Sequence, residues 1–235
     1  MRKQIMFILL LAAASQLSAQ QTDSISSQKS NLSFGIKLSP SINWIRAVNN
    51  DVQSDGATLK FGIGGVVAYH LSSEVSIVSG LNYNEFGGYV YDNASLSDPE
   101  TENNYLINYG EVEIPLALRL QTKPVNKASY YLQGGLSLSF VGKATEKHKS
   151  TYANTDPEII DIQSLTYPNR ISYNLGAGME YSVGKRAVVF GQITYKNALT
   201  NSANSDKYLD DPTRTYDSSL QILPGSMEFS VGFMF

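Results

Sequence analysis

Residues 172–181 read SYNLGAGMEY. Apolar side chains take every second position from Tyr173 to Tyr181, and small or polar residues take the positions between them. Because successive side chains of a β-strand point to opposite faces, this period of two predicts a strand with one apolar and one polar face. An aromatic residue stands at each end of the apolar face.

The same alternation returns elsewhere in the chain. It is equally clear in residues 60–70, 75–84, 130–140 and 227–235. Three further segments complete the set, at residues 32–45, 104–120 and 187–199, and the last of them alternates least clearly. The sequence therefore predicts an all-β chain of about eight strands. An even number of antiparallel strands leaves both chain ends on the same side, as in single-chain bacterial outer-membrane barrels.

The aromatic residues that end the apolar faces favour a membrane barrel over a soluble one. Tyr173 and Tyr181 are eight residues apart and Tyr130 and Phe140 are ten apart, which spans roughly 20–25 Å of membrane at the usual strand rise and tilt. The opposite faces are too polar for the packed core of a soluble barrel. We expect a closed, antiparallel, up-and-down transmembrane β-barrel whose lumen is filled by side chains. Its predicted aromatic girdle consists of Phe61, Tyr69, Tyr83, Tyr130, Phe140, Tyr173, Tyr181 and Phe235.

Connection lengths support the same topology. The expected long connections are residues 46–58, 86–103, 143–169 and 200–224, and they alternate with shorter ones at 71–74, 121–129 and 184–186. Outer-membrane barrels have short periplasmic turns and longer outer loops. We therefore expect both termini in the periplasm and the four long loops outside the cell, where they form the interaction surface for a protein partner.

The N-terminus has the composition of an export signal. Arg2 and Lys3 precede the apolar run 5–14, and small residues follow up to Ala19. This order predicts a signal peptide over residues 1–20, a disordered periplasmic tail over 21–30 and a barrel domain over 31–235. The formal net charge of −3 offers no basic surface for nucleic acid, and the chain contains no cysteine for a disulfide, a thiolate metal site or a nucleophile.

Residues 109–119 read YGEVEIPLALR, which resembles the Tyr-x-Glu-Ile-Pro-Leu-x-Leu-Lys strand of PorT-like outer-membrane β-barrel proteins. The resemblance extends to residues 134–138 and 176–181 and covers nearly the whole mature chain. It implies an outer-membrane barrel of the kind characteristic of Bacteroidetes, in a family whose founding member is linked to secretion and gliding machinery. The terminal Phe235 resembles the carboxy-terminal aromatic residue that barrel-assembly machinery reads.

Pro115 lies inside this motif and conflicts with a regular barrel strand. Proline has no N–H group to donate to the neighbouring strand, so within sheets it is found at edges and bulges. A closed barrel has no edge. We therefore expect a β-bulge or a broken ladder bond near residues 114–116.

The polar faces are predicted to carry eight charged side chains into the lumen, four of them basic and four acidic. These are Lys37, Lys60, Glu111, Glu113, Arg119, Glu180, Lys196 and Glu228. An eight-stranded barrel is just wide enough inside for its own side chains, and buried charges need partners. We expect a structural network of ion pairs that plugs the lumen. A narrow channel is the alternative.

The preferred function is a structural or binding role in the cell envelope without catalysis, in contact with outer-membrane lipid and lipopolysaccharide. An enzyme that modifies lipid A is a second alternative, because His148 and Ser150, with Glu158 or Asp161 downstream, resemble the His-x-Ser pair of small barrel deacylases. The polar run 143–155 around them predicts a solvated loop. His70 and His148 are the two histidines of the chain, so we expect no metal site and no cofactor.

Overall fold

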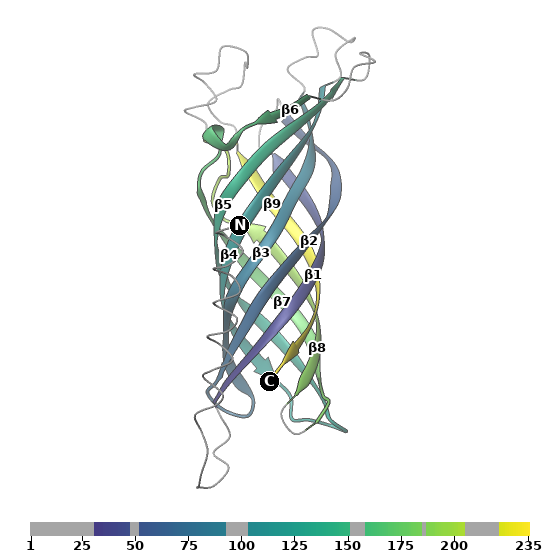
Figure 1. Cartoon of the computed structure of the whole chain (residues 1–235), viewed down its shortest axis with the longest axis vertical. Coiled ribbons are helices and arrows are strands. Elements are labelled where there is room, and N and C mark those ends of the chain that lie inside the picture. The colour runs from purple at the N-terminus through teal and green to yellow at the C-terminus, as the bar shows by residue number, and fades with distance from the viewer. Residues whose placement is uncertain (1–30, 48–51, 93–102, 151–157, 185–186, 205–220) are drawn as a thin grey trace, which may run out of the picture. The chain divides into compact units, whose positions relative to one another are not determined.

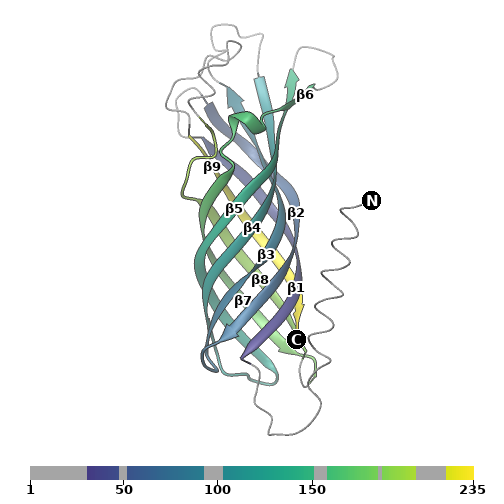
Figure 2. The same ribbon diagram turned by 60° about the vertical axis from the view of Figure 1, so that its left-hand side comes forward.

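Eight long strands wrap into a barrel that closes on itself (Figures 1 and 2). The computed structural model describes residues 31–47, 52–92, 103–150, 158–184, 187–204 and 221–235. The barrel strands are β1 (Leu32–Ala47), β2 (Val52–His70), β3 (Val75–Asp92), β4 (Asn103–Gln121), β5 (Ala128–Ser150), β7 (Asn169–Ser182), β8 (Val188–Ala198) and β9 (Ile222–Met234). A ninth strand, β6 (Glu158–Asp161), pairs with β5 outside the barrel ladder. The predicted closed, eight-stranded, antiparallel barrel is confirmed.

The first and last strands form the seam of the barrel. Each strand pairs antiparallel with its neighbours in the chain, and β1 pairs with both β2 and β9. At the end of the chain, the N–H of Phe34 donates to the carbonyl of Phe235 and the N–H of Phe235 donates back to Phe34, at 3.0 and 2.8 Å. The C-terminus lies at the end of the barrel opposite β6 (Figure 1).

The two faces of the wall differ as the alternation predicts. Large apolar side chains point outward along the strands, and Ile36, Leu81 and Leu136 are 67, 58 and 53 % exposed. Serine, asparagine and charged side chains point inward and are buried. Such an extensive exposed apolar surface is incompatible with a wall that faces water and suits one that faces lipid. Among the described residues, no helix is long and apolar enough to cross a membrane.

The strands at one end of the barrel extend further than the sequence predicted. Residues 52–58, 86–92, 143–150 and 222–224 were expected in long loops, and the structure places them in β2, β3, β5 and β9. The polar run around His148 is therefore strand up to Ser150. Strands above the apolar band have water on their outer face, so they lose the apolar alternation on which the prediction depended.

A short segment after β6 packs against the apolar side chains at this end of the barrel. It contains the 3₁₀ turn η2 (Gln163–Leu165) and bridges from β5 to β9: the N–H of Ile162 donates to the carbonyl of Ala144, and the N–H of Tyr167 donates to Ser202. Ser202 in turn donates to Ile222 at the start of β9. Figure 1 shows the turn and β6 together at the end of the barrel opposite the C-terminus.

Pro115 interrupts one ladder of β4. The pairing of β3 with β4 passes from Ser79 opposite Leu116 to Asn82 opposite Glu113, so the position of Pro115 has no recorded partner on β3. The hydroxyl of Ser79 donates to the carbonyl of Pro115 at 2.8 Å. The predicted break in the ladder is thus present, while the register shift between β4 and β5 lies further along, between Gly110 and Glu111.

Candidate functional site

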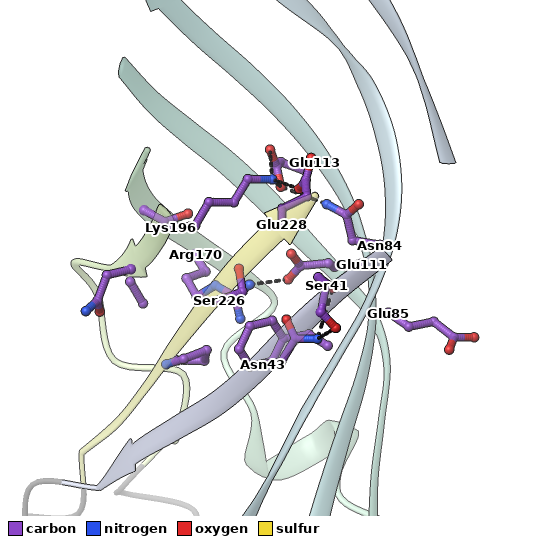
Figure 3. Close-up of a pocket in the computed structure, with 15 residues that line it drawn as sticks. Ser41, Asn43, Asn84, Glu85, Glu111, Glu113, Arg170, Lys196, Ser226 and Glu228 are labelled. Atoms are coloured by element: carbon purple, nitrogen blue, oxygen red, sulfur yellow. Dashed lines mark hydrogen bonds and ion pairs between the residues drawn. The ribbon is translucent and has the colours of Figure 1, made fainter. Parts of the chain in front are cut away.

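Charged side chains from four strands meet inside the lumen, and Figure 3 shows three of them, Glu113, Lys196 and Glu228. Lys196 Nζ on β8 lies 2.8 Å from Glu113 Oε2 on β4 and 2.6 Å from Glu228 Oε2 on β9. Lys37 Nζ on β1 lies 2.7 Å from Glu228 Oε1. Three ion pairs therefore tie β1, β4, β8 and β9 together across the interior.

Hydrogen bonds from neutral side chains complete the surroundings of Glu113. The amide of Asn84 donates to Glu113 Oε2 at 2.7 Å, and the hydroxyl of Ser137 donates to Glu113 Oε1 at 3.2 Å. Asn174 donates to the Ser137 hydroxyl at 2.9 Å. A buried carboxylate must replace the hydrogen bonds that it made with water, and this set of donors does so.

A fourth ion pair lies nearer to the end of the barrel that carries β6. Arg170 on β7 pairs with Glu111 on β4, and Ser139 donates to the same carboxylate at 3.3 Å. The guanidinium carbon of Arg170 also lies 5.1 Å from the centre of the Phe86 ring. Arg170 therefore contacts both the charged network and the apolar side chains beyond it.

A fifth ion pair lies toward the short connections. Arg119 Nη1 on β4 lies 2.5 Å from Glu180 Oε1 on β7. The other guanidinium nitrogens of Arg119 donate to Gln133, and the group stacks over the Tyr131 ring at 4.0 Å. Gln121 donates to the second oxygen of Glu180 at 2.9 Å.

The ion pairs of the lumen join four basic to four acidic side chains, and these are the numbers that the sequence predicted. One of the basic residues is not the predicted one. Lys60 donates to the side chain of Asn108 at 2.6 Å, and no ion pair of Lys60 occurs within the described part of the chain. Arg170 takes the fourth basic place. On β7, every second residue from Glu180 back to Ser172 is on the inward face, and the next such position is Arg170. Continuing the alternation by one step would therefore have predicted this residue.

Two apolar clusters lie inside the barrel on either side of the charged side chains. One is near the end that carries β6 and consists of Ile45, Phe86, Val90, Ile107, Tyr109, Val141, Ala144, Ile162, Ala203 and Ile222. The other is near the short connections and consists of Val66, Ala68, Val78, Phe190 and Met234. The sequence prediction missed both, because it treated the inner face as uniformly polar.

Small cavities remain among the charged side chains. One of about 20 Å³ is lined by Glu111, Glu113 and Arg170, among others, and one of about 40 Å³ is lined by residues that include Asn82 and Asn174. A water molecule needs about 10–15 Å³ of space open to its centre, so each cavity has room for one to a few waters. The interior is filled, with space for individual waters between its side chains.

The aromatic residues predicted for the girdle point outward. Seven of them are exposed, namely Phe61, Tyr69, Tyr83, Tyr130, Phe140, Tyr181 and Phe235. Tyr173 is half-buried because its ring packs against Tyr195, with 6.0 Å between ring centres. Trp44 packs on the other side of Tyr195, also at 6.0 Å. Trp44 and Tyr195 extend the set of outward aromatic residues beyond the sequence prediction.

Of the residues considered for catalysis, His148, Ser150 and Glu158 are described by their backbone alone. His148 and Ser150 lie on β5, where His148 is paired with Glu158 of β6, and the positions of these three side chains are outside the described structure. His70 lies between the hydroxyls of Ser33 and Ser76, at 3.1 and 2.8 Å. No group of three or more possible metal ligands occurs among the described residues.

A closed barrel with an apolar outer wall and a filled, ion-paired lumen defines a transmembrane β-barrel of the outer-membrane type. The family model of the outer membrane protein β-barrel domain matches residues 18–204. The chain belongs to this family, and its place in the cell is the outer membrane.

Several solved structures are similar to this chain at low sequence identity. Neisserial surface protein A is 12 % identical, with 86 % of this chain and 95 % of that chain covered and a TM-score of 0.46. OprG from Pseudomonas aeruginosa is 10 % identical, with 86 and 95 % covered and a TM-score of 0.44. The outer membrane protease OmpT from Escherichia coli is 11 % identical, with 92 and 99 % covered and a TM-score of 0.44. No curated protein sequence matches the chain.

Proposed function

We propose that the protein is a closed, non-conducting and non-catalytic barrel that acts as a structural or binding element of the outer membrane. The observation that carries this proposal is the filled interior. Ion pairs join β4 to β7 and β8, and β8 to β9, inside the lumen, and apolar clusters lie toward both ends. An ion crossing this interior would have to displace buried, paired side chains, which costs several kcal/mol for each pair broken.

The measurement that tests this proposal is single-channel conductance of the purified, refolded protein in a planar bilayer. A change in gel migration on heating reports that the sample is folded. We expect heat-modifiable migration without conductance. Steady, reproducible openings from folded protein would contradict the proposal and favour the narrow channel.

The orientation that goes with this function places both termini and the short turns in the periplasm. The long connections and the extended ends of β2 to β5 then project outside the cell, and we propose this end as the binding surface for a protein partner. Residues 1–20 act as the signal peptide in this proposal, and Phe235 is read by the barrel-assembly machinery. Cleavage by an external protease confined to residues 93–102 or 205–220 in intact cells would support the orientation, and cleavage only after outer-membrane permeabilisation would contradict it.

We also propose, on the resemblance of residues 109–119 alone, that the protein is a PorT-like barrel of the Bacteroidetes type. A link to secretion or gliding would follow from that relationship. Deleting the gene and measuring secretion of proteins to the cell surface tests it. Unchanged secretion and gliding would separate this barrel from that role.

The alternative of a lipid A-modifying enzyme has one observation in its favour, since the backbones of His148 and Ser150 lie on a strand. The distance of these two residues from the apolar band argues against the enzyme. His148 is eight residues beyond the girdle residue Phe140, which is roughly 20 Å above the apolar band at the usual rise and tilt. An acyl chain in the membrane would not reach that level. Lipid A with unchanged acylation after Ser150→Ala is the result we expect.

A further inference from the structure

Two buried amide side chains line the larger cavity of the lumen, the one of about 40 Å³. Asn82 on β3 and Asn174 on β7 are 2 and 3 % exposed. The amide nitrogen of Asn82 donates to Glu113 Oε1 at 3.5 Å, and that of Asn174 donates to the Ser137 hydroxyl at 2.9 Å. Neither amide oxygen has a hydrogen-bond donor among the described residues. A buried polar atom needs such a partner, so the two oxygens indicate a ligand in this cavity.

The two amides converge on one carboxylate. Asn82 reaches Glu113 directly, whereas Asn174 reaches it through Ser137, whose hydroxyl donates to Glu113 Oε1 at 3.2 Å. These four residues lie on β3, β4, β5 and β7, which are consecutive neighbours in the wall. A ligand that contacts both amide oxygens would therefore close this arc of hydrogen bonds into a ring that includes Glu113.

The charges around the cavity decide which ligand fits. Three basic residues, Lys37, Arg119 and Lys196, and two acidic residues, Glu113 and Glu228, line it. The surplus of positive charge opposes a cation. An anion needs hydrogen-bond donors, whereas the two unused atoms are acceptors. Water is uncharged, can donate two hydrogen bonds and fits the volume of the cavity.

We propose that water is bound in this cavity as a hydrogen-bond donor to the amide oxygens of Asn82 and Asn174, as a permanent part of the barrel. Bound water restrains both amides and, through them, the carboxylate of Glu113, which pairs with Lys196. It thereby helps to hold the ion-paired network in place. The proposal rests on the proposed function in one respect, since a closed lumen retains its water for longer than an open one.

The apolar side of the cavity offers a way to displace the water without changing a polar group. Val66, Val78 and Phe190 line the cavity and belong to the apolar cluster near the short connections. Val78→Ile extends one lining side chain by a methyl group. Val231→Ile makes the same change on the outer wall, where the side chain is 62 % exposed, and serves as the matched control.

A crystal structure of the refolded barrel, at a resolution that shows individual waters, tests the site directly. We expect a water within about 2.7–3.2 Å of each amide oxygen. Magnetic relaxation of oxygen-17 in the solvent counts the long-lived waters of the same protein in micelles. Val78→Ile should hold at least one fewer than the wild type, and Val231→Ile the same number. Asn82→Leu combined with Asn174→Leu should also lower the count, because apolar cavities stay dry.

The outcomes separate the possible occupants. An empty cavity in the crystal structure, or a water count that neither Val78→Ile nor the double asparagine variant lowers, would overturn the proposal. Crystals grown with rubidium and bromide ions test for an ion, and anomalous scattering from the cavity would also overturn it. Conductance from a barrel that contains the water would contradict the proposed function alone. An empty cavity in a barrel that does not conduct would contradict this proposal alone.

Discussion

The inward face of β4 changes its chemistry within four residues. Ile107 and Tyr109 belong to an apolar cluster, whereas Glu111 and Glu113, the next two inward positions, are ion-paired. Below this point the outer face of β4 is apolar, as Val112 and Ile114 show. Above it, the neighbouring outward positions on β3 and β5 carry Glu85 and Lys143. Along β4, the interior is therefore polar where the outer face is apolar, and it is an ordinary apolar core where the nearby outward positions are charged.

The largest loss of stability should come from removing a carboxylate at the centre of the ion-paired network in the lumen. Glu113→Ala leaves Lys196 with one carboxylate and leaves Asn84 and Ser137 without their acceptor. Removing one member of a buried ion pair costs about 3–5 kcal/mol. Urea unfolding of the barrel refolded in lipid vesicles measures the loss. A loss under about 1 kcal/mol would mean that the network does not stabilise the fold.

A similar but somewhat smaller loss should follow from a cavity in the apolar region. Phe86→Ala removes a ring that packs with Tyr109 at 6.4 Å between centres and with Arg170. Large-to-small changes of this kind in a packed core cost about 3 kcal/mol or more. The same unfolding measurement applies, with Phe61→Ala on the exposed outer face as the control for loss of a ring alone. Equal losses at both positions would show that the cluster is not a core.

The boundary between the two regions can be moved by a double substitution. Glu111→Leu with Arg170→Met replaces a buried ion pair by apolar side chains of comparable size, a change that is often neutral or stabilising. We expect the double variant to stay within about 1 kcal/mol of the wild type, while Glu111→Leu alone leaves Arg170 unpaired and loses more. A double variant as unstable as the single one would show that the two regions cannot be interchanged.

The smallest loss of stability should come from breaking an ion pair that lies outside the lumen. Lys123 and Glu74 form an ion pair at 3.6 Å between two short connections, and both side chains are largely exposed. Surface pairs contribute little because water and salt screen them. Lys123→Ala should change the free energy of unfolding by less than about 0.5 kcal/mol. A larger change would weaken the argument that burial gives the lumen pairs their importance.

This comparison also explains which parts could be read from the sequence. The lipid-facing part of each strand has a period of two that is visible in residues such as Tyr173 to Tyr181, and it gave the strand number, the inward faces and seven members of the ion-paired network. The upper ends of β2, β3 and β5 follow the opposite rule, with polar residues outside, so they resembled loops. Lys60 bonds to Asn108 beside an interruption in the pairing of β2 with β3, and such an interruption has no sequence pattern of its own. The apolar clusters combine side chains from many strands, and only the closed barrel brings them together.

The pairing of β1 with β9 has a consequence for the order of events in folding. Lys37 and Glu228, which face each other across this seam, are 191 residues apart in the chain. Contacts so distant in sequence close a very long loop, and such topologies fold slowly. Until β9 arrives, β1 and β8 each present an unpaired edge along which other chains could add. The last strand is therefore the step that converts an aggregation-prone sheet into a finished barrel, and a chain shortened before Ile222 should be removed by proteolysis in the periplasm before it reaches the membrane.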